Sequence, residues 1–416
     1  MMKTLLKSIL PACLALCLSG CAQKREEGTL RIWCHQGQEA ENRAMREMVE
    51  AFNLAHAEQG VRATIDFFPD YQYTERLAIA AAAGDLPDVF DLDGPTVAQF
   101  VDAGVLAPLT PYFTEEELAD FLPTILEQGT IDGTLYALGA FDSAMVLYYD
   151  RAMFEEAGVT PPPENEAWTW AEFVEACRLL RAADIEPVSL HMDVTADEWY
   201  TYAFSPLIWS AGGALIDVET KRTEGVLNSA VNVAVLRDWQ NLFEEGFASR
   251  SPINPDPFGA GDTAMDWSGH WMARSHIENK GERLGVMPLP RTGPEPAAAC
   301  GSWCWAISAK TDRPELAALW LQWVTDTDHG VRPIVAAGGA VPARFSAFEH
   351  FPEYESDPFR LFRHLLSEHG RPRPQTPQYA TLTQQFAAAL RDIAGGADVE
   401  ERLNRAAAAV QRTLDR

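Results

Sequence analysis

The apolar residues that follow residue 28 are spaced first as in a strand and then as in a helix, and this order repeats. Residues 29–33 alternate as a strand does, and residues 45–52 carry apolar side chains at the i, i+3, i+4, i+7 spacing of one buried helix face. Residues 63–67 alternate again, a helix rich in alanine ends at Gly84, and residues 87–90 form a short apolar run. This order predicts an α/β fold, with a mostly parallel sheet covered by helices on both faces.

Later segments add helices and indicate a second lobe. Thr169-Trp170-Ala171-Glu172 has the form of a capping box, and two C-terminal helices are separated by Gly395-Gly396. Beyond residue 28 the chain is too long for one core and has no tandem repeat or low-complexity linker. We therefore expect two lobes between which the chain crosses more than once. The tryptophans on predicted helix faces are expected in the core: Trp170, Trp239, Trp320 and Trp323.

The first 28 residues have the pattern of a targeting segment. Lys3 and Lys7 precede an apolar stretch over residues 9–18, which is too short to span a bilayer. Leu18-Ser19-Gly20-Cys21 resembles the lipobox of bacterial lipoproteins, in which the cysteine becomes the first residue and carries the lipid. We predict a lipoprotein signal peptide at 1–20, lipidation of Cys21 and a charged tether at 21–28. The protein is then exported and anchored to a membrane, facing the periplasm or the cell exterior; the alternative is that Cys21 is an ordinary thiol.

Charge and cysteine content narrow the possible partners. The chain has a formal net charge of −27 and no basic stripe, so nucleic acid is not expected as a partner. Four cysteines remain after the lipobox: Cys34, Cys177, Cys300 and Cys304. Cys177 is expected as a small buried apolar residue. Cys300 and Cys304 are too far apart along a strand to bridge each other, and a disulfide from Cys34 to one of them stays open.

Four short blocks occur in a fixed order along the chain. They are Gly84–Val89 leading into Ala103–Leu109, Asp132–Ala137 leading into Leu147–Asp150, Phe258–Met265 followed by Gly269-His270-Trp271, and Met287–Pro290 followed by Gly301 and Ala306–Ser308. Each block alone is weak evidence for a protein family. Their order and spacing over residues 30–414 resemble the extracellular solute-binding proteins of ABC importers, in the branch typified by maltose-binding protein.

The resemblance implies a two-lobed, periplasmic-binding-protein-like (type II) fold whose hinge-linked lobes close on a ligand. It places lobe 1 at residues 29–142, completed by about 303–340, and lobe 2 at 143–300, completed by about 341–416. Crossings between the lobes are expected near 141–143, 300–302 and 341–342. The family also implies a binder and not an enzyme, which delivers its ligand to the transmembrane permease of an ABC transporter. We expect a monomer.

A sugar ligand needs polar groups for its hydroxyl rim and flat rings for its apolar face. Trp271 matches the stacking tryptophan of the family, and the other aromatic candidates are Trp199, Tyr200, Tyr202, Trp267, Trp303 and Tyr379. Polar candidates follow predicted strands or lie at the crossings: His35, Gln36, Gln38, Asp91, Asp93, Asp142 and Ser302. The alternative for each aromatic residue is packing in the core, and for each polar residue a solvated loop or a local cap. The bulky residues Trp303-Cys304-Trp305 replace the small residues that are usual at this crossing in the family. The size of the family's ligand pocket is therefore not transferred to this protein.

Other functions stay open at this point. The ligand can also be a polyamine, a polyol phosphate or a peptide, and the protein can serve as a ligand sensor. A secreted glycoside hydrolase would also need paired carboxylates and tryptophans, although no two carboxylates are placed at a fixed separation. Gly259–Ala264 fits a dinucleotide-binding pattern but does not follow a strand. The histidines show no metal-ligand spacing, and we expect no cofactor.

Overall fold

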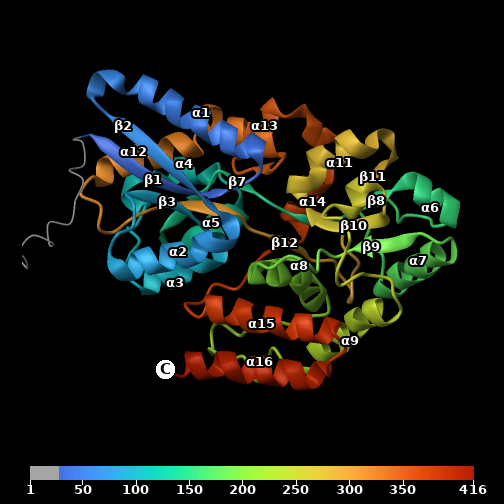
Figure 1. Cartoon of the computed structure of the whole chain (residues 1–416). Helices are drawn as coiled ribbons and strands as arrows, with labels where there is room; N and C mark the ends of the chain where they lie inside the picture. Colours follow the sequence, from blue (N-terminus) through green and yellow to red (C-terminus); the bar gives the residue numbers. More distant parts are fainter. Residues whose placement is uncertain (1–27) are drawn as a thin grey trace, which may run out of the picture.

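The computed structural model describes residues 28–416, so the predicted signal peptide, Cys21 and the tether up to residue 27 lie outside the described residues. Its two largest sheets lie in two bodies, each with its own helices (Figure 1). The α/β class predicted from the sequence is confirmed. None of the described helices has both the length and the apolar character needed to span a membrane.

The first sheet has the strand order β2–β1–β3–β13–β6. β1 pairs in parallel with β2 and β3, but β13 runs antiparallel to both β3 and β6. Because β6 then points the same way as β1, β2 and β3, four of the five strands run in one direction, and the prediction of a mostly parallel sheet is wrong only at β13. The reason is that β13 comes from far along the chain, and the order of neighbouring segments does not reveal so distant an insertion. The strands are β1 (Thr29–Gln36), β2 (Arg62–Pro69), β3 (Val89–Asp93), β6 (Ala137–Gly139) and β13 (Trp303–Ile307).

Helices cover both faces of this sheet, as predicted. The apolar stripe of α1 is buried against the sheet, and Met45, Met48, Val49 and Phe52 are each at most 6% exposed. Tyr73 and Leu77 of α2 are buried on the opposite face. The helices of this lobe are α1 (Glu39–Ala55), α2 (Asp70–Ala83), α3 (Val97–Asp102), α4 (Glu115–Ala119), α5 (Pro123–Gly129), α12 (Pro314–Thr325) and α13 (Arg332–Gly338).

The second sheet has the order β11–β8–β10–β9, and all seven residues of β10 are buried. Its strands are β8 (Met145–Asp150), β9 (Glu186–Ser189), β10 (Thr263–Gly269) and β11 (Leu284–Met287). Trp239 and Trp320 lie in the cores of the two lobes as predicted, while Trp170 and Trp323 are partly buried against them. The remaining helices are α6 (Arg151–Ala157), α7 (Trp170–Ala182), α8 (Asp197–Ser210), α9 (Ala230–Glu244), α10 (Pro257–Ala260), α11 (Ala273–Lys280), α14 (Phe359–Glu368), α15 (Tyr379–Ala394) and α16 (Val399–Leu414).

Short strands join the two sheets. The chain passes from β6 to β8 through β7 (Phe141–Asp142), which pairs with β14 (Val341–Pro342), and it passes from β11 to β13 through β12 (Ala298–Cys300). β12 pairs with β15 (Gly370–Pro372), and Ala144 forms an isolated bridge with Cys300. The three places where crossings were expected therefore lie side by side. A separate hairpin consists of β4 (Thr130–Ile131) and β5 (Thr134–Leu135).

Short-range features predicted from the sequence are present in the structure. Gly84 ends α2 with φ +71°, and the capping box of α7 forms, with Thr169 accepting from the N–H of Glu172. Cys177 is fully buried, as expected for a small apolar residue. The four cysteines within residues 28–416 are free, so Cys34 forms no disulfide with Cys300 or Cys304.

We expect Gly301→Ala to lower the free energy of unfolding by about 3 kcal/mol, because the residue has φ +113° and a side chain would meet two fixed groups. An added Cβ would lie 2.9 Å from Gln128 Oε1, which already accepts from the N–H of Ser302, and 3.3 Å from Arg373 Nη2. Denaturant unfolding checks this. Gly396→Ala is the control, since its φ is +92° but no atom lies within 4 Å of the added methyl. Equal losses in the two variants would contradict the expectation.

Candidate ligand-binding site

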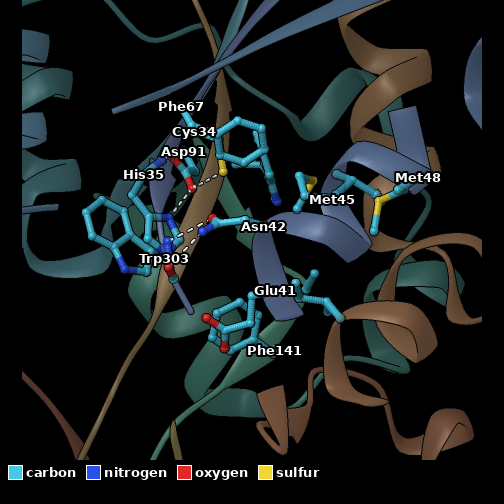
Figure 2. Close-up of a pocket in the computed structure, with 15 residues that line it drawn as sticks. Cys34, His35, Glu41, Asn42, Met45, Met48, Phe67, Asp91, Phe141 and Trp303 are labelled. Carbon is cyan, nitrogen blue, oxygen red and sulfur yellow. Dashed lines mark hydrogen bonds and ion pairs between the residues drawn. The ribbon is translucent and has the colours of Figure 1, made fainter. Parts of the chain in front are cut away.

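The carboxyl ends of β1 and β3 bring His35 and Asp91 together (Figure 2). Asp91 is 1% exposed; its Oδ1 accepts from the backbone N–H of His35 at 3.0 Å, and its Oδ2 lies 2.5 Å from His35 Nδ1. A proton on Nδ1 facing the carboxylate leaves Nε2 as an acceptor. The imidazole stacks on Trp303, with centroids 4.0 Å apart and planes 7° apart. Asp91 thus positions His35, and His35 and Trp303 together form a flat, half-buried surface.

Cys34 completes this network beneath the stacked rings. Its Sγ donates to Asp91 Oδ2 at 3.3 Å. Burial raises the pKa of the Cys34 thiol, and the charge of Asp91 raises it further, so the thiol stays protonated and keeps this bond. The cavity beside these residues has a volume of about 20 Å³, room for one or two water molecules. A sugar ring does not fit in this cavity as it stands.

Trp271 lies in a second aromatic group, on the other lobe. It is half-buried, and its ring lies 6.0 Å from that of Tyr202 and 6.4 Å from that of Trp199. A Cβ at Gly269 would lie 2.2 Å from the Trp271 ring, so the glycine lets the indole lie directly on the end of β10. This contact explains the Gly-x-Trp spacing. Trp199 and Trp271 are both only partly buried against the core of this lobe.

Four of the predicted aromatic residues are buried in the core of the second lobe: Tyr200, Tyr202, Trp267 and Tyr379. Trp267 is 1% exposed and its Nε1 donates to the carbonyl of Ala203 at 2.9 Å. Tyr200 is fully buried and its hydroxyl donates to the carbonyl of Met192 at 2.9 Å. Trp267 and Tyr200 have no exposed surface for a ligand in this arrangement.

Asp142 and Ser302 lie at the crossings. Asp142 is fully buried, and its Oδ1 accepts from the N–H groups of Ser143 at 2.8 Å and Gly301 at 2.9 Å. Its Oδ2 accepts from Thr124 Oγ1 at 2.5 Å. Ser302 is 5% exposed, and its Oγ has no hydrogen-bond partner among residues 28–416. The oxygens of Asp142 are used within the chain, where they connect two crossing segments.

Asp93 and Tyr379 are linked through two residues that the sequence did not point to, Arg373 and Glu198. Arg373 bonds both oxygens of Asp93 and also donates to Glu198 Oε1, which accepts from Tyr379 Oη at 2.5 Å. Burial raises the pKa of Glu198; the charge of Arg373 opposes this rise and the charge of Asp93 adds to it. The sequence carries no spacing or motif that joins residues 93, 198 and 373.

Gln36 is the last residue of β1 and Gln38 lies in the loop that follows, and both are exposed. The backbone N–H of Gln38 donates to Glu41 Oε2 at 2.8 Å, close to the start of α1. Of the predicted residues, the structure thus brings together His35, Asp91 and Trp303 on one lobe and Trp199, Tyr202 and Trp271 on the other. Arg373 connects the two groups, because it bonds Asp93, the register partner of Trp303, and lies over the ring of Tyr202 at 4.7 Å.

A buried carboxylate with two histidines supports the second group. Asp266 is fully buried, with Oδ1 2.6 Å from His191 Nε2 and Oδ2 2.8 Å from His276 Nε2. His191 makes an edge contact with Trp199, with centroids 5.6 Å apart. Burial lowers the pKa of His191, but the charge and hydrogen bond of Asp266 raise it more. Burial raises the pKa of Asp266, but the two histidines lower it more.

We expect the contribution of His191 to stability to be larger at pH 6 than at pH 8.5. A raised histidine pKa stabilises the fold below the unfolded value of about 6.5, and this stabilisation is lost as pH rises through the folded value. The lowered pKa of Asp266 stabilises the fold above the unfolded value of about 3.9, and this stabilisation is lost as pH falls through the folded value. Melting temperatures of His191→Gln and wild type across pH check this, with exposed His350→Gln as the control. A loss that does not change with pH would contradict it.

Comparison with known proteins identifies the family. A profile for bacterial extracellular solute-binding proteins matches residues 36–330, well over half of the chain. The chain belongs to this family. The resemblance inferred from the four blocks is thereby confirmed. Because the proteins of this family are extracellular, membership implies that this protein is exported.

Relatives of this solute-binding protein include binding proteins from several organisms. One from Brucella abortus (strain 2308) is 25% identical over 48% of this chain and 51% of its own length, so the chain spans about half of that relative. An arabinooligosaccharide-binding protein of Bacillus subtilis (strain 168) is 21% identical over 82% of this chain and 80% of its own. The structure of a solute-binding protein of Thermotoga lettingae bound with α-D-tagatose has a TM-score of 0.80 at 21% identity, covering 93% of this chain and 100% of that one. This likeness shows the two-lobed fold.

Proposed function

We propose that this solute-binding protein captures a small carbohydrate, a mono- or oligosaccharide, and delivers it to the permease of an ABC transporter. The observation that carries the proposal is the half-buried Trp271, packed with Tyr202 and Trp199 on one lobe, with the His35–Trp303 stack at strand ends of the other. Flat rings of this kind suit the apolar face of a sugar. The names of the relatives add support, since they include binders of an arabino-oligosaccharide and of tagatose.

The wider setting is part of the same proposal. The protein is exported and anchored through lipid on Cys21, works as a monomer, and releases its ligand chemically unchanged. Lobe 1 consists of residues 29–142 with about 303–340, and lobe 2 of residues 143–300 with about 341–416. The adjacency of β7, β12 and β14 supports this division, because the chain passes between the sheets there.

A thermal-shift screen of the purified protein tests the proposal. The panel contains mono-, di- and oligosaccharides, polyols, polyol phosphates, polyamines and peptides. A specific ligand at 100 times its dissociation constant adds about 2.7 kcal/mol, which raises the melting temperature by about 5 °C or more. We expect at least one carbohydrate to do this. If only polyamines, peptides or polyol phosphates shift the melting temperature, the carbohydrate assignment is wrong although the protein is still a binder.

A further inference from the structure

Arg373 is a buried cation bonded to carboxylates from two lobes. Its side chain is 3% exposed, Nη1 and Nη2 each donate to Asp93 at 2.7 Å, and Nη1 also donates to Glu198. Its guanidinium lies over the ring of Tyr202 at 4.7 Å from the centroid. The pairing with Asp93 is bidentate, the stronger geometry for an arginine and a carboxylate.

The partners of Arg373 belong to different lobes. Asp93 ends β3 in the first sheet, while Glu198 lies in the first turn of α8, which packs in the core of the second lobe. Arg373 itself follows β15, whose partner β12 belongs to the crossing segments. A hinge motion that separates the lobes moves Asp93 away from Glu198, so the guanidinium must give up one of its two partners.

Breaking such a contact is costly because the groups are buried. Exposed ion pairs contribute little, but a buried charge that loses its partner is left uncompensated. Without the guanidinium, the carboxylates of Asp93 and Glu198 would repel each other across the junction. The same cation therefore favours the arrangement in which Asp93 and Glu198 meet, which we call closed, and removes a repulsion that opposes it.

We propose that Arg373 is a latch between the lobes: a positioning residue that holds the closed arrangement without touching the ligand. This inference goes beyond the proposed function, because it concerns the lobes in the absence of any ligand. The fraction of molecules that is closed is then set by Arg373. The apparent dissociation constant depends on the fraction of protein molecules whose lobes are arranged so that they can bind ligand. Because Arg373 changes that fraction, it also changes the affinity for the ligand.

Small-angle X-ray scattering of the ligand-free protein tests the latch. We expect Arg373→Met to raise the radius of gyration by on the order of 1 Å, from the roughly 21 Å of a compact chain of this length. Arg373→Lys keeps the charge but cannot make the bidentate pair, so it should restore only part of the difference from the wild-type value. Arg391→Met is the matched control, because Arg391 bonds Asp197 at 2.6 Å and lies over Tyr200, all within the second lobe. It should leave the radius unchanged.

Glu198→Gln and Asp93→Asn keep the proposal testable if Arg373→Met does not fold. Each removes one charge from the latch while an amide oxygen can still accept from Arg373, and each should raise the radius by less than Arg373→Met. Folded variants whose radius equals that of wild type would overturn the latch. An increase of the same size in Arg391→Met would also overturn it. Neither result bears on carbohydrate binding, which the thermal-shift screen tests separately.

Discussion

Replacing Trp271 by alanine is expected to weaken carbohydrate binding by about 100-fold. A tryptophan ring that covers one face of a sugar removes more than 100 Å² of apolar surface from water, which corresponds to roughly 3 kcal/mol. The ring is held in place by contact with Gly269 and by Tyr202 and Trp199, so it is oriented before the ligand arrives. Isothermal titration calorimetry with the carbohydrate found in the screen measures the loss.

Two controls separate a binding effect from a folding effect. Trp170→Ala removes another half-buried tryptophan, which packs against Phe173 on α7, and should leave affinity within about twofold. Trp271→Phe keeps a flat ring and should recover most of the affinity. An alanine variant that binds as tightly as wild type would remove Trp271 from the site.

Replacing Asp142 by alanine is expected to lower the free energy of unfolding by about 4 kcal/mol. The change leaves the buried N–H groups of Ser143 and Gly301 and the hydroxyl of Thr124 without their acceptor, and each unsatisfied group costs about 1–3 kcal/mol. Because Ser143 and Gly301 belong to the crossing segments, the hinge loses its internal support. Denaturant unfolding followed by tryptophan fluorescence measures the loss.

Asp142→Asn distinguishes the acceptor from the charge. Burial raises the pKa of Asp142, and the hydrogen bonds from Thr124, Gly301 and Ser143 only partly offset this, so the charge itself is costly at this position. An asparagine oxygen can still accept from both backbone N–H groups. We therefore expect the asparagine variant to lose less than half as much stability as the alanine variant. Equal losses would show that the negative charge is what the hinge needs.

Local signals in the sequence were sufficient to predict the elements near them. The buried stripe of α1, the end of α2 at Gly84 and the capping box at Thr169 each depend on residues within two turns of one another. Contacts over short distances in the sequence determine such features, so the pattern contains the information. The insertion of β13 next to β3 depends on packing between segments more than 200 residues apart, and no periodicity records it.

The candidate site was predictable only in part. In β10 every residue is buried, so alternation does not distinguish Trp267, which lies in the core, from Trp271, which lies just past the strand end on a glycine that accommodates it. Asp91 and Asp142 were expected as possible ligand contacts, but their oxygens are occupied by His35, Cys34, Thr124 and backbone N–H groups. Arg373 could not be found at all, because its partners come together only in the folded chain.

Isothermal titration calorimetry of the purified protein with the strongest carbohydrate of the screen tests whether the protein captures a sugar. We expect saturable heats, one ligand for each chain, and a baseline that returns to zero after every injection because the sugar is bound and not converted. No heat with any carbohydrate would contradict carbohydrate capture. A sustained heat flow from turnover of the sugar would contradict the claim that this protein is a binder and not an enzyme.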